Sequence, residues 1–329
     1  MTMRIRCSRG PASLGSPICG IYLGGLNWFE ATLAGYNGSA WVTLAAVDPV
    51  GVLTGLEWTR YGNSIEVTTT GGDDVARYIA PDELAGGSFR DTTTGHVWRI
   101  IGNTDGIWKA GATRRPVIYL EAGASGATTG TAGQIAMPSV LVPWRHSARL
   151  SKIRLTIPSQ TTADGDIRVG VSAIGPIFVF GTQYSRGREL ETMHNTDLAT
   201  SATGGRSARV AGPTRRSVSF AWAEGVDTSQ LFAAGADYGK YHASDDPAAI
   251  TQAAPLMIDG LFRQLDGPAK PVVYCPRLVV SEVGTSLPAL GESLYGRIVS
   301  SSVRRAAVLG DEAADELQRV MSLTIEEEV

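Results

Sequence analysis

Cysteine is scarce in this sequence. Three cysteines, Cys7, Cys19 and Cys275, occur among 329 residues, and no C-x-x-C pair is present. An odd, widely spaced set excludes a closed disulfide framework, and a zinc or iron–sulfur site would need a fourth ligand and closer spacing. We therefore expect small buried side chains at these positions, with no metal and no cofactor.

Histidine is also rare, and the motifs of common enzymes are missing. The four histidines stand alone without an H-E-x-x-H motif, and the chain has no G-x-S-x-G elbow and no G-x-x-x-x-G-K-[ST] loop. The sequence therefore predicts that the protein is not an enzyme. Two alternatives stay open. One is a loose Ca²⁺ site at a carboxylate pair, Asp73-Asp74 or Asp245-Asp246. The other is a glycan-cleaving pair of carboxylates drawn from Glu30, Asp48, Glu57 and Glu66.

Lysine and long apolar runs are the remaining deficits. Only four of the 29 cationic residues are lysine, and the formal net charge is −3, so no basic excess predicts nucleic-acid binding. The arginine excess reflects genome composition or, alternatively, bidentate pairing with carboxylates at subunit interfaces. No segment has the length of a membrane span or the pattern of a signal peptide, and we expect synthesis in the cytoplasm.

Glycine, in contrast, is abundant, with 39 residues scattered between short apolar runs. Asn37-Gly38 separates residues 26–36 from 40–48, and Gly62-Asn63 separates residues 53–60 from 64–70, which predicts two β-hairpins. Further strands are expected at residues 97–101, 117–121, 150–157 and 166–173, the last two as an antiparallel pair. The Gly-, Ala- and Thr-rich residues 122–134 have no anchoring side chain, and we expect a loop or flexible linker there.

The second half of the sequence mixes strands with short helices. Residues 185–213 are polar and predict a long loop or arm, followed by a strand at 217–222. Helices are expected at residues 227–236 and 246–265, with an acidic helical turn at 311–317, and strands at 271–280, 297–309 and 319–328. The final strand ends in Glu326–Glu328, which would blunt a sheet edge. Its expected cationic partners are Arg215, Arg216, Arg304 and Arg305, in this chain or in a neighbouring subunit.

These patterns predict a mainly β protein with a jelly-roll-like β-sandwich and a second β-rich domain that carries a few short helices. The expected boundaries are an N-terminal strand or arm at 1–25, the sandwich at 26–185 and the second domain at 186–329. Six of the seven tryptophans lie in the first 150 residues. Most of them suit core filling between two sheets. As exposed platforms for a sugar ring, the candidates are Trp41, Trp58 and Tyr36.

Two segments of the first half carry a resemblance. A turn with an aromatic residue, a glycine, a tryptophan and a leucine occurs at Tyr36, Gly38, Trp41 and Leu44, and a strand segment with the sequence KIRLTI begins at Lys152. Together they resemble the galactose-binding, discoidin-like modules, in which such a hairpin lies beside such a strand. The resemblance covers about half of the chain and implies a jelly-roll sandwich.

Three segments of the second half carry a second resemblance. RRSVSFAWAEGVD at 215–227, GLFRQLDGPAKPVVYCPRL at 260–278 and LTIEEEV at 323–329 resemble distal-tail and baseplate-type proteins of long-tailed bacteriophages. The resemblance implies a structural virion protein of the tail, made in the host cytoplasm. Its partners would be copies of itself in a ring, tail-tube proteins, and tail hub or fibre proteins. The iron–sulfur hub proteins of such tails have more cysteines than this chain. The alternative is a carbohydrate-binding adhesin or receptor-binding module that contacts a host-surface glycan.

Overall fold

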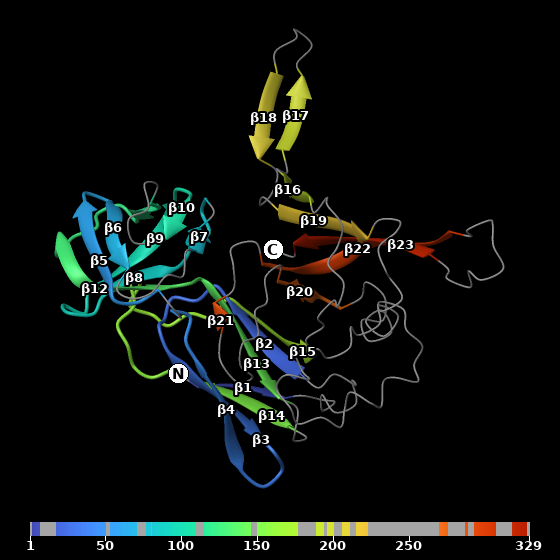
Figure 1. Cartoon of the computed structure of the whole chain (residues 1–329), viewed down its shortest axis with the longest axis horizontal. Coiled ribbons are helices and arrows are strands. Elements are labelled where there is room, and N and C mark those ends of the chain that lie inside the picture. Colours follow the sequence, from blue (N-terminus) through green and yellow to red (C-terminus); the bar gives the residue numbers. More distant parts are fainter. Residues whose placement is uncertain are drawn as a thin grey trace. The chain divides into compact units, whose positions relative to one another are not determined.

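The structure, a computed structural model, is built from strands. It describes residues 2–6, 18–50, 53–70, 77–79, 81–108, 115–145, 150–176, 189–193, 196–200, 206–210, 215–222, 270–275, 287–288, 293–306 and 318–327. Every regular element in these ranges is a β-strand (Figure 1), so the protein is mainly β as predicted. The helices expected at 227–236 and 246–265 and the turn at 311–317 lie outside the described residues. In the described part, no helix is long and apolar enough to cross a membrane.

The chain divides into two compact units. Unit 1 consists of Met1–Ile177 and Cys275–Glu292, and unit 2 consists of Phe178–Tyr274 and Ser293–Val329. The chain first passes from unit 1 to unit 2 after Ile177, close to the boundary expected after residue 185. The return of the chain to unit 1 near Cys275 carries no signal in the sequence. It brings β21 (Leu287–Pro288) into register with Val140 and Leu141 of unit 1.

Unit 1 contains a β-sandwich. One sheet has the order β1-β14-β3-β4, with β1 at Thr2–Arg6, β14 at Lys152–Thr156, β3 at Ala31–Tyr36 and β4 at Trp41–Val47. The other has the order β15-β2-β13-β21, with β15 at Val171–Pro176, β2 at Ile18–Gly24 and β13 at Ser139–Arg145. Residues 1–25, expected as a strand or arm, thus supply one strand to each sheet. Alternate residues of both sheets share one buried core, which includes Leu23, Val142, Ile153 and Leu155.

The local patterns of this sandwich explain its hairpin but not its strand order. β3 and β4 pair antiparallel around Asn37-Gly38, which confirms the predicted hairpin. Gly38 adopts a φ of 102°, and the Asn37 Oδ1 atom accepts hydrogen bonds from the backbone N–H groups of Ser39 and Ala40. The expected antiparallel pair of residues 150–157 and 166–173 is wrong. β14 pairs with β1 and β3 in one sheet, whereas β15 pairs with β2 in the other.

A closed six-stranded barrel is inserted between β4 and β13 of the sandwich. Its order is β11-β6-β5-β12-β8-β9, with a two-stranded sheet of β7 (Arg77–Ile79) and β10 (Gly106–Trp108) as an addition. The barrel strands are β5 (Leu56–Tyr61), β6 (Ser64–Thr70), β8 (Ser88–Asp91), β9 (Val97–Asn103), β11 (Val117–Leu120) and β12 (Thr129–Ala136). β5 and β6 form the second predicted hairpin. The expectation of one sandwich over 26–185 is therefore incomplete, because local alternation does not distinguish a strand of a sandwich from one of a barrel.

Strand β12 corrects part of the loop or linker expected at 122–134, because residues 122–128 are turns and irregular backbone but residues 129–134 belong to this strand. Its glycines provide the space that aromatic rings of the barrel core fill. A Cβ atom on Gly130 would lie 2.5 Å from Trp58 Nε1, and one on Gly133 would lie 2.7 Å from Phe89 Cζ. Trp58 and Phe89 are 1% and 0% exposed, with ring centroids 5.4 Å apart. A segment without large side chains is therefore ordered by its neighbours' side chains rather than by its own.

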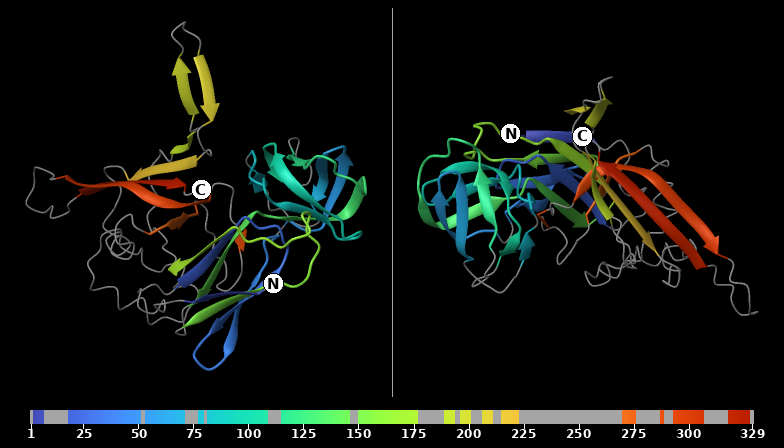
Figure 2. Two further views of the ribbon diagram at one scale, coloured as in Figure 1. Left: turned by 180° about the vertical axis from the view of Figure 1, so that it is seen from behind. Right: turned by 90° about the horizontal axis from the view of Figure 1, so that it is seen from above.

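Unit 2 is a five-stranded antiparallel sheet with a separate hairpin (Figure 2). The sheet has the order β16-β19-β23-β22-β20, with β16 at Glu189–Met193, β19 at Arg215–Trp222, β23 at Gln318–Glu327, β22 at Leu294–Ala306 and β20 at Val272–Tyr274. The predicted final strand is confirmed, but it is the central strand of the sheet rather than an edge.

The polar segment at 185–213, expected as a loop or arm, contains strands. Besides β16 it includes β17 (Thr196–Thr200) and β18 (Arg206–Val210), which pair only with each other among the described strands.

Candidate functional site

Two of the three predicted aromatic residues meet on the hairpin β3–β4. Tyr36 and Trp41 are directly paired across the two strands, and their ring centroids lie 5.5 Å apart with the planes tilted by 53°. Both residues are partly exposed. The hairpin turn fixes this pair, because the first residue after a short antiparallel loop lies opposite the last residue before it.

Strand β14 adds a cation to each ring. Lys152 is paired with Tyr36, and its Nζ atom lies 5.4 Å from the centre of that ring. The Arg154 guanidinium carbon lies 4.4 Å from the centre of the Trp41 ring. Both distances suit cation–π attraction, which holds the two cations at defined positions on the sheet surface. We call this set, Tyr36, Trp41, Lys152 and Arg154, the aromatic–cationic face.

The neighbouring strand β1 brings two further basic residues into register with β14. The register places Arg4 opposite Arg154 and Arg6 opposite Lys152, and directly opposed residues of an antiparallel pair share one face of the sheet. The four strands β1, β14, β3 and β4 contain no Asp or Glu. Like charges directly opposite each other destabilise a sheet.

No described carboxylate neutralises the cations of β14. The ion pairs of the described residues join other groups, and the buried Nε atom of Arg154 has no hydrogen-bond partner.

Trp58, the third predicted platform, is not available to a ligand. Its side chain is 1% exposed and packs edge-on against Phe89 and Trp98 in the barrel core. The interpretation of Trp58 as a sugar platform is corrected, and core filling is its observed role. The hydrophobic alternation of β5 turns Leu56 and Trp58 inward together.

Of the four predicted assembly arginines, Arg216 is the one that the structure pairs with a C-terminal glutamate. Its Nε and Nη2 atoms donate to the two carboxylate oxygens of Glu327, and its backbone N–H donates to Glu327 Oε2 at 3.0 Å. Its Nη2 atom also donates to the backbone oxygen of Ser293. Because both side chains are largely shielded from solvent, with 32% and 19% exposed, this bidentate pair ties β19 to β23 within one chain.

The other three arginines form no described pair with these glutamates. Arg215 is exposed at the start of β19, next to Met193 of β16. Arg304 and Arg305 lie in β22, opposite Val320 and Arg319, and their side chains are outside the described set.

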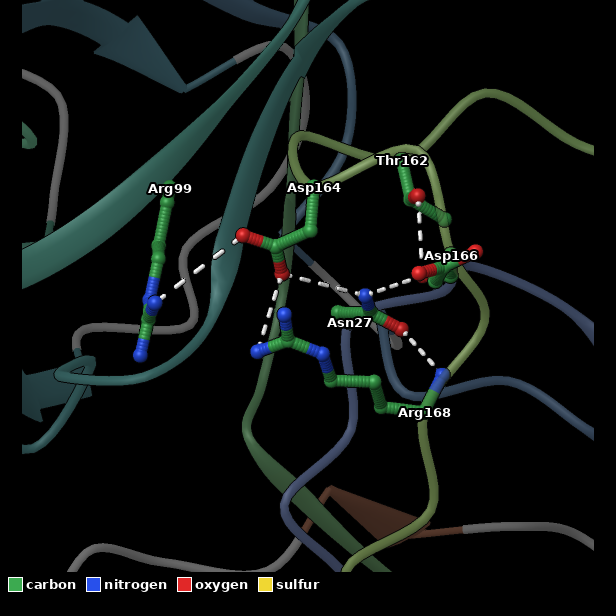
Figure 3. Close-up of polar contacts among 6 residues, drawn as sticks. All are labelled: Asn27, Arg99, Thr162, Asp164, Asp166 and Arg168. Carbon is green, nitrogen blue, oxygen red and sulfur yellow. Dashed lines mark hydrogen bonds and ion pairs between the residues drawn. The ribbon is translucent and has the colours of Figure 1, made fainter.

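A second polar cluster surrounds Asn27, which the sequence analysis did not single out (Figure 3). The Asn27 side chain donates to Asp164 Oδ2 at 3.3 Å and to the backbone oxygen of Asp166 at 2.6 Å. Its Oδ1 atom accepts from the backbone N–H of Arg168 at 2.8 Å. Thr162 donates to the same Asp166 oxygen at 3.0 Å. The buried Asn27 amide thus contacts three residues of this turn, Asp164, Asp166 and Arg168.

Asp164 connects this turn to the barrel. Its carboxylate lies 3.9 Å from Arg99 Nη1 of β9 and 3.4 Å from Arg168 Nη1, and Figure 3 shows it between the two guanidinium groups. Two cations beside one carboxylate disfavour a metal ion there. No group of three His, Cys, Asp or Glu side chains suited to a metal occurs among the described residues. The Asn27 cluster is therefore a structural connection inside unit 1.

Arg90 of the barrel makes a comparable connection. Its guanidinium lies 4.1 Å from the centre of the Phe29 ring and donates to Gln134 Oε1. Burial lowers the pKa of Arg90 from its ordinary value, and the carboxylate of Glu30 partly offsets that shift. Arginine stays charged at neutral pH in such surroundings.

The carboxylates considered for glycan cleavage are dispersed over several elements. Glu57 and Glu66 lie exposed on barrel strands β5 and β6, Glu30 is exposed directly before β3, and Asp48 accepts a hydrogen bond from the Val50 backbone N–H. Asp73, Asp74, Asp245 and Asp246, the candidates for Ca²⁺, lie outside the described residues.

Comparison with known proteins adds no family to this geometry. No protein-family model, no curated protein and no solved structure matches the chain.

Proposed function

We propose that the protein is a structural subunit of the tail tip or baseplate of a long-tailed bacteriophage. In this proposal it forms a ring or adaptor between the tail tube and the host-contacting parts, and it resides in the virion tail. Its partners are copies of itself, tail-tube proteins, and hub or fibre proteins, and it carries out no catalysis.

The hairpin β17–β18 is the observation that carries this proposal. Neither strand pairs with a third strand among the described residues, and an isolated two-stranded hairpin is at best marginally stable in water. A partner that covers the hairpin would stabilise it, and in a ring a neighbouring subunit can be that partner. The strand-built architecture and the resemblance of the second half to tail-tip proteins support the same function. Two of the resembling segments, at 215–222 and 323–327, are neighbours in β19 and β23.

The location of the protein tests the proposal directly. An antibody raised against the full chain should label the distal end of the tail in negative-stain images of intact particles. Label on the capsid, or no label on any particle, would refute the function.

The hairpin gives a second test that does not need a labelled particle. Replacement of Thr196–Val210 by a short glycine-serine linker should leave the far-UV circular dichroism of the sheet intact and abolish incorporation into particles. A control chain that carries an unrelated, stable hairpin at the same place should also fail to incorporate, because the contact needs these side chains. Normal incorporation of the deletion variant would show that the hairpin plays no part in assembly.

The aromatic–cationic face favours a second candidate function, a carbohydrate-binding module for a host-surface glycan. Tyr36 and Trp41 are the aromatic residues that remain for it, because Trp58 is buried. Glycan-array binding by the full chain should then be lost in Trp41→Ala and kept in Tyr61→Ala, which removes an exposed ring from the barrel surface. Equal binding by both variants would exclude this function.

A further inference from the structure

The outer surface of the barrel carries large apolar side chains that its core does not use. Tyr61 of β5, Ile101 of β9 and Tyr119 of β11 are 60%, 57% and 43% exposed. Their strands are neighbours, because the closed barrel contains the order β9-β11-β6-β5. Exposed apolar residues are ordinary when they stand singly, whereas a contiguous patch marks an interaction site.

The strand register aligns the two tyrosines in one row. Tyr61 and Tyr119 are both paired with Ser64 of β6, and Tyr119 is also paired with Gly102 of β9. Directly opposed residues share one face of a sheet, so two rings alternate with two small residues across these strands. A Cβ atom on Gly102 would lie 3.9 Å from Tyr119 Cδ2, so this ring packs beside a position that has no side chain. We call Tyr61, Ser64, Tyr119 and Gly102 the tyrosine row.

A β-bulge adds an apolar side chain at the Gly102 end of the tyrosine row. The pairing of β11 with β9 shifts its register between Tyr119, opposite Gly102, and Leu120, opposite Ile100. Ile101 is therefore the additional residue of β9, and it is exposed whereas Ile100 is fully buried. Bulges re-aim a side chain and are over-represented next to functional sites. This bulge thus extends the apolar surface beside Tyr119.

The spacing of the two rings suits a polyproline II helix that lies across the strands. Tyr61 and Tyr119 are two strand spacings apart, which is about 9.6 Å. A polyproline II helix has three residues per turn and a rise of about 3.1 Å per residue, so it repeats after roughly 9.3 Å. Residues i and i+3 of such a ligand would each contact one ring. Its carbonyl groups make no internal hydrogen bonds and can accept from the tyrosine hydroxyl groups.

Carboxylates border the tyrosine row on two sides. Glu66 is exposed and follows Ser64 by two positions on β6, so both side chains belong to the same face. At the other end, a Cβ atom on Gly102 would lie 2.6 Å from Asp82 Oδ1, and Asp82 is also exposed. Negative charge at these positions favours a ligand with a basic residue.

The positive charge of these four strands is engaged within the chain. Arg60 and Arg99 are the cations of β5, β6, β9 and β11. The Arg60 guanidinium donates to four backbone oxygens, and Arg99 lies beside the Asp164 carboxylate. The charges beside the row therefore do not suit the phosphates of a nucleic acid.

We propose that the tyrosine row binds a proline-rich segment of a partner protein in the polyproline II conformation, with a basic residue of that segment beside Glu66. The ring spacing, the apolar extension at Ile101 and the bordering carboxylates each fit this occupant. The segment is already extended before it binds, and the rings stand on paired strands, so little conformational entropy is lost on association. The inference is independent of the tail-tip function.

Fluorescence polarisation with the full chain tests the contact. The probe is a fluorescein-labelled proline decamer that ends in arginine, and we expect saturable binding with a dissociation constant below about 1 mM. Tyr61→Ala and Tyr119→Ala should each raise this constant by about tenfold or more, because each removes one of the two rings. Tyr61→Phe keeps the ring and should change it by less than about threefold. The matched control is Val42→Ala, which removes an exposed apolar side chain from the sandwich and should leave the constant unchanged.

A charge variant tests the orientation of the ligand. Glu66→Gln should weaken binding of the decamer that ends in arginine by roughly threefold and leave a decamer that ends in glutamine unaffected. A loss that is the same for both probes would show that the basic residue does not lie beside Glu66.

Several outcomes would overturn the inference. These are no saturable binding of the decamer, equal effects of Tyr61→Ala and Val42→Ala, and equal binding of a glycine–serine decamer, which does not favour the polyproline II conformation. Another is a neutral oligosaccharide or single-stranded DNA that binds the parent chain but not Tyr119→Ala, while the proline decamer does not bind. All the replaced side chains are exposed, and far-UV circular dichroism verifies that each variant is folded. Because the peptide assay uses purified protein, it can fail while the tail-tip label succeeds, and the reverse also holds.

Discussion

Gly133 of strand β12 decides between a flexible linker and a packed barrel wall. A Cβ atom at this position would lie 2.7 Å from Phe89 Cζ, 2.9 Å from Trp58 Cδ1 and 3.0 Å from the backbone oxygen of Leu56. The two rings are fully buried, and the third atom belongs to the paired strand β5, so none of the three moves freely. Gly133→Ala should therefore overpack the barrel and lower its stability by about 1–3 kcal/mol.

The sign of the effect makes the test decisive. In a flexible linker the same substitution would stabilise the protein by about 0.4–1 kcal/mol, because it reduces the conformational entropy of the unfolded chain. For a small domain, 1 kcal/mol corresponds to a shift in the melting temperature of about 4–8 °C. Near-UV circular dichroism during heating follows the packed Trp58 and Trp98 rings, and peptide-resolved hydrogen exchange locates the loss of protection in β5 and β12.

Thr131→Ala is the control for this experiment. Thr131 is exposed on the same strand, so its truncation should change the stability by no more than about 0.5 kcal/mol. An unchanged or raised melting temperature in Gly133→Ala, with normal exchange protection in β12, would refute the packing argument.

Three further perturbations test other parts of the fold. Trp98→Phe should cost about 0.5–1.5 kcal/mol more in urea unfolding than Trp58→Phe, because Trp98 Nε1 donates to the Ser125 backbone oxygen at 2.8 Å whereas the buried Trp58 Nε1 has no partner; equal costs would contradict this. A double-mutant cycle of Arg216→Ala and Glu327→Ala should give a coupling of about 1–2 kcal/mol for their bidentate pair, and a coupling near zero would exclude a stabilising role. Truncation after Gln318 removes the central strand β23 and leaves β19 and β22 without the partner between them, so the chain should become insoluble, and a soluble truncated chain with an intact sheet would be inconsistent with that topology.

Pairs of residues that are close in sequence could be predicted well. The turns at Asn37-Gly38 and Gly62-Asn63 predict the hairpins β3–β4 and β5–β6 because turn chemistry acts over a few residues. The final strand β23 was predictable from its apolar alternation. A cationic partner for the glutamates at its end was predictable too, although the sequence alone could not select Arg216 from the four candidates.

The candidate site could be predicted only in part. Tyr36 and Trp41 belong to one hairpin, so their proximity follows from the turn. Lys152 and Arg154 are more than a hundred positions further along the chain, and their place beside these rings depends on the pairing of β14 with β3. Asn27 and Asp164 carried no motif, because a single buried amide has no sequence pattern that distinguishes it from an exposed one.

The sequence by itself determined the mainly β class and the two hairpins with their turns, because these depend on side-chain alternation and on glycine and asparagine in local conformations. Only the tertiary structure decided that a barrel is inserted into the sandwich, that Trp58 is core, and that residues 129–136 are a strand rather than a linker. It also decided that Lys152 and Arg154 of β14 lie beside the rings of Tyr36 and Trp41. Each of these features is a contact between distant segments. Such contacts are selected by the burial and pairing of the whole chain, and no short stretch of residues encodes them.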